Sequence, residues 1–261
     1  IWALLGVECM SRLNDKVVLV TGGASGLGKS GATLMHAEGA KVIITDINDD
    51  LGKATAQEIG GDALFVHHDV SKLAEWDRVI DLVIDRYGRL DVLVNNAGIV
   101  VVADVEKTTL ADWRSVHGVG TDGTFFGIQK GIGVMRNAGG GSIINMSSLA
   151  GLIGYPLIFA YSASKGAIRS MTKSAAVYCA QNSLGIRVNS IHPGTIATPM
   201  VAGFESDVEE QGEERIKLLL GEPDDVGHMM VYLASDESKF VSGSEFVIDS
   251  TASITEGLVP G

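Results

Sequence analysis

Residues 21–28 read TGGASGLG, and they lie between the apolar run VVLVT at 17–21 and a helical segment that extends to about Glu38. Glycines at 22, 26 and 28 permit a tight turn, let backbone approach a diphosphate, and allow a helix to pack closely on a strand. The N–H groups at the start of that helix form an anion site. A glycine motif alone is weak, but its place between strand and helix predicts a dinucleotide-binding unit.

Short β-branched runs alternate with helix-like segments along most of the chain. These runs are continuously apolar, which is typical of strands buried on both faces. The repeated βαβ pattern predicts an α/β fold, a single-domain Rossmann-type doubly wound parallel sheet of about seven strands with helices on both faces. The strands are expected at residues 17–21, 41–45, 63–67, 90–95, 142–147, 186–191 and 245–249.

Composition excludes several classes of partner. The chain of 261 residues has a net charge of −12 and shows no basic cluster, which argues against nucleic acid and anionic membrane surfaces. No apolar run approaches the roughly 18 residues of a membrane span. Cys9 and Cys179 have no metal or disulfide spacing, which favours a reduced, cytoplasmic setting. We expect no metal, and we interpret all six histidines as structural or surface residues.

The chain carries no Pro-rich or Ser-rich linker, so residues 10–261 are expected to form one dinucleotide-binding catalytic domain. Met10, followed by SRLNDKVVLV, looks like a natural start. We therefore interpret residues 1–9 as an extra or non-native segment.

Asp46 ends the second predicted strand, eighteen residues beyond the glycine motif. A carboxylate there can accept both hydroxyls of an adenosine ribose and would repel a 2′-phosphate, which favours NAD over NADP. Ala24 and Ser25 offer no arginine or lysine to such a phosphate. The alternative is an ordinary acidic turn residue, since other acidic residues follow.

The stretch FAYSASKGA at 159–167 places Tyr161 and Lys165 four residues apart. On a helix they would share one face, about 6 Å apart. The ammonium would then lower the phenol pKa from about 10 and make Tyr161 a general acid/base. In isolation, such a pair is more often a surface tyrosine packed on a lysine stem.

TGxxxGxG, NNAG at 95–98 and a serine thirteen residues before YxxxK occur here in order. With them, the chain resembles the short-chain dehydrogenase/reductase family over roughly residues 11–249. Through RLNDKVVLVTGG and HPGTIATPM it is most similar in look to NAD-dependent secondary-alcohol and hydroxysteroid dehydrogenases. The resemblance implies hydride transfer between NAD and a secondary alcohol or its ketone, and a homo-oligomer, either a dimer or a homotetramer.

The resemblance implies a role for each matching residue. Tyr161 would be the acid/base, Lys165 would lower its pKa and hold the nicotinamide ribose, and Ser148 would hydrogen-bond the substrate oxygen. Ser147 competes with Ser148, and NNAG could instead serve only to tie the fourth strand to its neighbours. The expected cofactor-binding residues are Gly22, Ser25, Gly26, Leu27, Gly28, Asp46, Ile47, Asp69, Val70, Asn96, Gly98, Tyr161, Lys165, Pro193, Gly194, Ile196 and Thr198.

Three segments depart from the family pattern. Gly120 stands where the family has an asparagine that kinks a helix and holds a water, although glycine can still kink a helix. LLLGEPDDV at 218–226 is a short connector, which puts a substrate lid near 196–222 in doubt, and the C-terminus lacks the usual glycines. These departures favour one alternative, an NAD(H)-binding scaffold or sensor with impaired turnover. The face of Gly123, Gly127 and Gly131 predicts contact with another helix, such as a partner subunit's.

The loops at 149–160 and 200–204 are mainly apolar and carry no basic residue. A phosphorylated or carboxylated substrate would want lysine or arginine there. We therefore expect a small apolar alcohol or ketone, such as a cyclic alcohol, an aryl ketone or a steroid. The alternative is that these residues only pack the lid, and a carbonyl reductase using NADPH is a further alternative that Asp46 disfavours.

Overall fold

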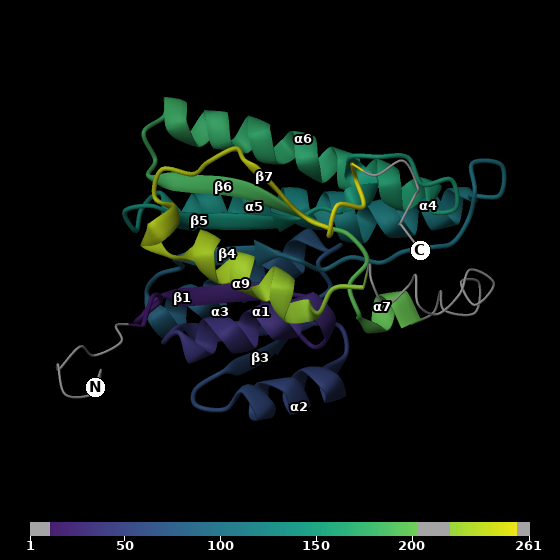
Figure 1. The fold of residues 1–261 in the computed structure, drawn as a ribbon. Helices are drawn as coiled ribbons and strands as arrows, with labels where there is room; N and C mark the ends of the chain where they lie inside the picture. The colour runs from purple at the N-terminus through teal and green to yellow at the C-terminus, as the bar shows by residue number, and fades with distance from the viewer. Residues whose placement is uncertain (1–10, 203–219, 255–261) are drawn as a thin grey trace, which may run out of the picture.

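Seven parallel strands form one sheet in the order β3-β2-β1-β4-β5-β6-β7 (Figure 1). Every neighbouring pair is parallel. The prediction of a seven-stranded parallel sheet is confirmed, and each strand bound differs from the expected one by at most two residues. The strands are β1 (Val17–Thr21), β2 (Lys41–Asp46), β3 (Leu64–His67), β4 (Val92–Asn95), β5 (Gly141–Met146), β6 (Ile186–Pro193) and β7 (Glu245–Ile248).

The computed structural model describes residues 11–202 and 220–254. The expected extra segment at 1–9, most of the predicted lid and the last residues of the chain lie outside this range. The helices are α1 (Gly26–Ala37), α2 (Asp49–Ile59), α3 (Leu73–Tyr87), α4 (Leu110–His117), α5 (Gly123–Met135), α6 (Phe159–Gln181), α7 (Pro199–Ala202) and α9 (Pro223–Ala234). Among the described residues, no helix combines the length and apolarity needed to cross a bilayer.

The central strands bury both of their faces, which explains their continuously apolar sequence. In β1, Val18 and Val20 join one core cluster, which includes residues of α1 and α9. Val17 and Leu19 join the other cluster, with α3, α5 and α6. Because side chains alternate along a strand, one apolar run supplies both cores. Figure 1 shows α1 and α9 crossing one face of the sheet.

The glycine face of α5 packs within the chain. A side chain at Gly127 would overlap with Asn95 and Trp76, and one at Gly131 would lie 3.0 Å from Leu93. The predicted close contact with another helix is therefore made within the chain, to α3, and not to a partner subunit. The glycines instead let α5 lie close to β4 and α3.

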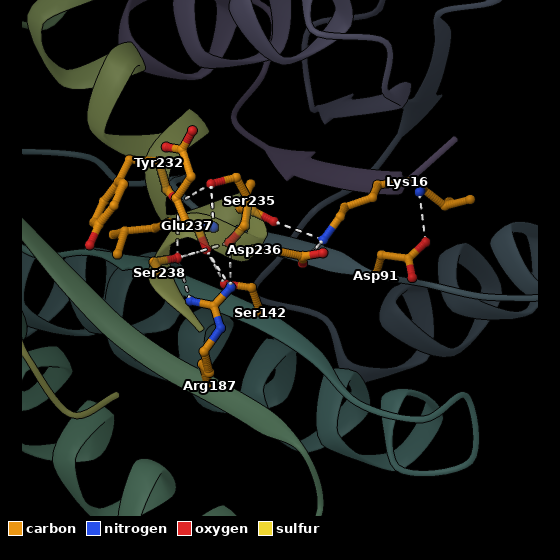
Figure 2. A network of polar contacts seen from close by, with 12 residues as sticks. Lys16, Asp91, Ser142, Arg187, Tyr232, Ser235, Asp236, Glu237 and Ser238 are labelled. Carbon is orange, nitrogen blue, oxygen red and sulfur yellow. Dashed lines mark hydrogen bonds and ion pairs between the residues drawn. The ribbon is translucent and has the colours of Figure 1, made fainter. Parts of the chain in front are cut away.

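A polar network closes the C-terminal end of α9 at the amino-terminal edge of the sheet (Figure 2). Arg187 donates to the carbonyls of Leu233 and Ser235 at 2.8 and 3.2 Å, and Lys16 donates to that of Ala234 at 3.4 Å. Cations at a helix C-terminus are favoured by the helix dipole. This network holds α9 on the sheet from the end opposite the site described below.

Candidate active site

A cavity of about 900 Å³ opens at the carboxyl ends of the strands. It lies where the chain reverses direction across the sheet, between β1 and β4, and this is the position at which doubly wound sheets bind ligands. All the expected catalytic and cofactor-binding residues line it except Gly28, and so do Met200 and Val201, but no residue of the expected substrate loop at 149–160 does.

The turn before α1 provides the anion-binding end of the cavity. Gly22 and Gly26 adopt φ of +61° and +52°, a left-handed conformation that favours glycine. Among the described residues, Ser25 caps α1 without a side-chain hydrogen bond, and the first turn carries no acidic residue. This helix start therefore suits a diphosphate, as the motif predicts.

Gly28 is buried and does not line the cavity. A side chain there would overlap with the Gly22 carbonyl and lie 2.6 Å from Asn96. We therefore assign Gly28 to packing of α1 under the loop, and not to contact with a cofactor.

Asp46 lies at the end of β2 and lines the cavity beside Ile47. Its carboxylate accepts a hydrogen bond from Asn48 N–H at 3.0 Å and one from Ala24 N–H at 3.3 Å. Two backbone donors on different segments fix this carboxylate against the glycine loop. Its remaining lone pairs are placed to accept ribose hydroxyls.

The two adjacent asparagines have different partners. Asn95 donates to Asn145 at 2.8 Å, and Asn145 donates to Thr172 at 2.9 Å, so Asn95 ties β4 to β5 and α6. Asn96 donates to the carbonyls of Thr21 and Gly22 at 2.9 and 3.0 Å and also lines the cavity. The structural alternative for NNAG therefore holds for Asn95.

Tyr161 and Lys165 lie on one face of α6, with Lys165 Nζ 5.4 Å from the centroid of the Tyr161 ring. Lys165 is buried and donates to the Met146 carbonyl at 2.7 Å. Burial lowers the pKa of Lys165 to about 8. The helical spacing thus brings the pair together as predicted.

The expected lowering of the Tyr161 pKa by Lys165 is wrong for this chain. Burial raises the pKa of Tyr161, and a hydrogen bond with the hydroxyl of Ser148 opposes that rise. Desolvation is the larger of the two effects, because removing the phenol from water disfavours its charged form.

Ser148 suits the donor role better than Ser147 does. Ser147 is buried and donates to the Lys165 carbonyl at 2.8 Å. Ser148 Oγ accepts a hydrogen bond from Ala150 N–H at 3.1 Å, bonds with Tyr161 and lies in the cavity wall. The two hydroxyls of Ser148 and Tyr161 can therefore meet one substrate oxygen.

Gly120 lies in a π-helical turn at Gly118–Asp122 between α4 and α5. The expected kink thus takes the form of an extra residue in the helix, a feature that is frequent at functional sites. A side chain at 120 would overlap with Ser164 Oγ. Thr121 Oγ1 donates to that hydroxyl at 3.0 Å and pairs with His117 Nδ1 at 2.9 Å.

The predicted lid is described only at its two ends. Ala197 N–H donates to the Gly221 carbonyl at 2.8 Å, and Gly221 N–H donates to that of Thr195 at 2.9 Å. Residues 203–219 lie outside the described range. The two hydrogen bonds place Gly221, at the described end of the short connector, beside the segment that follows β6.

Sequence reasoning missed a second part of the cavity wall. These residues come from α4, the π turn and the ends of β3, β4 and β5, and only the fold brings them to the cavity. They include His68, Ala97, Ile99, Arg114, Ser115, Gly118, Val119 and Met146. Within residues 11–202 and 220–254, no cluster of three or more His, Cys, Asp or Glu side chains could hold a metal.

Comparison with known proteins places the chain among oxidoreductases. A family profile described as Enoyl-(Acyl carrier protein) reductase matches residues 22–251. The NADP-dependent (R)-specific alcohol dehydrogenase of Lentilactobacillus kefiri is 48% identical over 244 residues, covering 91% of this chain and 96% of that protein. The 3-alpha-(or 20-beta)-hydroxysteroid dehydrogenase of Mycobacterium tuberculosis is 44% identical over 238 residues, covering 91% and 89%.

Two further comparisons agree. The cyclopentanol dehydrogenase of Comamonas testosteroni is 43% identical over 246 residues, covering 92% of this chain and 98% of that protein. The crystal structure of levodione reductase superposes with a TM-score of 0.87 at 31% identity and covers 93% of this chain and 99% of that one. The similarity in sequence and in structure therefore extends over almost the whole chain.

Proposed function

The chain belongs to the short-chain dehydrogenase/reductase family, and from this we propose that it interconverts an apolar secondary alcohol and its ketone with NAD as the cofactor. The observation that carries the proposal is the meeting of Ser148, Tyr161 and Lys165 in the cavity that also holds the glycine loop. The family binds a nicotinamide cofactor, which accepts or donates the hydride when bound.

In alcohol oxidation, the residues of this chain manage the proton and hold the substrate oxygen. Tyr161 takes the hydroxyl proton of the substrate, while Ser148 donates a hydrogen bond to the same oxygen. Lys165 lies beside Tyr161, and a positive charge there would favour the phenolate, which burial of the phenol disfavours. Its contact with the Met146 carbonyl at 2.7 Å fixes the position of that charge.

The choice of NAD rests on Asp46. Its fixed carboxylate would repel a 2′-phosphate, and the loop at 21–28 carries no cation to bind one. The relative from Lentilactobacillus kefiri is named NADP-dependent, so relatedness alone does not decide the cofactor.

Exchange of Asp46 tests this choice. We expect wild type to prefer NAD and the double variant Asp46→Ala, Ser25→Arg to shift kcat/KM toward NADP by about 100-fold or more, since one charge repulsion is replaced by one attraction. Ser25→Ala is the matched control. A wild type that already prefers NADPH would contradict the role of Asp46.

The substrate class rests on apolar side chains near the cavity. Met200 and Val201 line the wall, and Met200 is 40% exposed. The segments 149–160 and 200–204 carry no cation for an anionic substrate. NADH formation with cyclic, aryl and steroid secondary alcohols, alongside sugars and phosphorylated alcohols, tests the proposal. Turnover of sugars and phosphorylated alcohols alone would overturn the proposed substrate class. NADH binding without turnover of any alcohol would favour a scaffold or sensor.

We also propose a homo-oligomer in a reducing, cytoplasmic setting. Phe125 of α5 and Val177 and Tyr178 of α6 are about half exposed, between 47% and 55%. Exposed large apolar side chains on two helices that contact each other favour a protein interface. Light scattering at micromolar concentration would give the mass, and a monomer would contradict this proposal.

A further inference from the structure

His192 is a fully buried side chain near the end of β6, one residue before the predicted cofactor loop at Pro193. Its Nδ1 lies 3.3 Å from the Ser148 carbonyl oxygen, and its Nε2 lies 2.8 Å from Ser190 Oγ. A carbonyl oxygen can only accept, so Nδ1 carries the proton. Nε2 then accepts from the Ser190 hydroxyl, and the two contacts together select one neutral tautomer.

The surroundings keep this imidazole neutral. Burial lowers the pKa of His192. Lys165 and Arg169 of α6 also lower it, while Glu245 of β7 and the bond to Ser148 raise it. A neutral ring can donate at Nδ1 and accept at Nε2 at the same time, as both contacts require.

The carbonyl that His192 contacts belongs to the serine of the site. Ser148 precedes a short 3-10 turn at Leu149–Gly151, and its carbonyl also accepts from Gly151 N–H at 2.9 Å. The last backbone bond of the sheet before this point runs from Ser147 N–H to the Ile191 carbonyl at 2.8 Å. Beyond this bond, the contact between His192 Nδ1 and the Ser148 carbonyl forms a further link between the ends of β5 and β6.

We propose that His192 is a positioning residue, which holds the Ser148 peptide so that the Ser148 hydroxyl stays directed toward Tyr161. This inference rests on the proposed function, because it assigns a task to His192 in the same site. It differs from the sequence-based interpretation of all six histidines as structural or surface residues. A residue that acts through the backbone of its neighbour leaves no motif in the sequence.

A matched pair of substitutions separates the two ring nitrogens. Asparagine carries an N–H donor near the place of Nδ1, whereas the longer glutamine reaches toward the place of Nε2. We expect His192→Asn to keep kcat within about threefold of wild type, and His192→Gln to lower kcat by about one order of magnitude or more, with the KM for NAD unchanged. Equal activity of both variants and wild type would overturn the proposal.

Ser190→Ala supplies a second test, which by itself leaves His192 in place. It removes the donor to Nε2 and so frees the ring to change tautomer. We expect a smaller loss of kcat than for His192→Gln, and no additional loss when Ser190→Ala is combined with His192→Asn. Fully additive losses would overturn the proposal.

Two measurements need no turnover, so they separate failure of this inference from failure of the proposed function. In ¹⁵N-histidine spectra of the protein alone, one ring is expected to show the Nδ1–H neutral tautomer at neutral pH, and this signal should be missing in both variants at 192. In absorbance titrations, the pKa of Tyr161, identified by Tyr161→Phe, is expected to rise in His192→Gln, because the Ser148 hydrogen bond lowers it in wild type. An Nε2–H tautomer, or an unchanged Tyr161 titration, would show that His192 only fills the core.

Discussion

Each end of the sheet holds a positively charged side chain, half-buried Arg187 at one end and buried Lys165 at the other, and the two charges are held differently. At the amino-terminal edge, Arg187 donates to the Leu233 and Ser235 carbonyls and to Ser238 Oγ. At the carboxyl edge, Lys165 donates to the Met146 carbonyl at 2.7 Å, and burial lowers its pKa to about 8. The first end satisfies its cation with several acceptors, while the second holds its cation by the Met146 carbonyl and lowers its pKa. Stability and chemistry are therefore placed at opposite edges.

Tyr161→Phe should give the largest effect at the carboxyl edge. We expect kcat for alcohol oxidation to fall about 10²–10⁴-fold, because the proton acceptor is removed. The free energy of unfolding should stay close to that of wild type. Steady-state NADH absorbance together with urea unfolding checks both, and a variant with wild-type kcat would show that another group takes the proton.

Arg187→Met should produce the opposite outcome at the amino-terminal edge. Three acceptors around the end of α9 lose their donor, so the free energy of unfolding should fall by about 3 kcal/mol. The folded fraction should keep its kcat/KM, since the network in Figure 2 lies at the far edge of the sheet. Urea unfolding and the NADH assay measure the two quantities. A large loss of kcat/KM in folded protein would mean that the edges are coupled.

The lowered pKa of Lys165 predicts a pH dependence that Arg187 should not share. Burial lowers the Lys165 pKa from 10.5 to about 8, so between these values the unfolded chain binds more protons than the folded chain. The cost of the buried charge is present in full below pH 8 and is lost as the pH rises toward 10.5. The stability of Lys165→Met relative to wild type should therefore fall by about 2 kcal/mol between pH 8 and pH 10.

Arg187→Met is the control for that titration. Arginine stays protonated throughout this range, so its stability difference from wild type should be flat. Urea unfolding at several pH values provides the data. A flat difference for Lys165→Met as well would mean that Lys165 titrates like an exposed lysine.

Gly120→Asn should lower the free energy of unfolding by less than Arg187→Met does. Because Ser164 Oγ already occupies the space, the new side chain should cost about 1–2 kcal/mol through overpacking. Adding Ser164→Ala should recover part of that loss, and Ser164→Ala alone is the matched control. Thermal unfolding checks the order of the four proteins. Equal stability of Gly120→Asn with and without Ser164→Ala would show that the two positions do not compete.

The sequence predicted the sheet well because strands buried on both faces need continuous apolar runs and local turn residues. It also predicted the helical Tyr161 and Lys165 pair, since four-residue spacing on a helix is a local property. It failed for quantities that depend on distant packing. Desolvation raises the pKa of Tyr161, and the glycine face of α5 meets its own sheet. His192 acts on a backbone carbonyl 44 residues away, which no local pattern records.

The most direct test of hydride transfer uses cyclopentanol deuterated at its carbinol carbon, with NAD and the wild-type protein. We expect NADH to form and to carry one deuterium, with none lost to water, and we expect Tyr161→Phe to form almost none. Mass spectrometry of the reduced cofactor measures the label. If bound NAD is never reduced by this alcohol or by the aryl and steroid alcohols, or if the label appears in water, the proposed reaction is wrong.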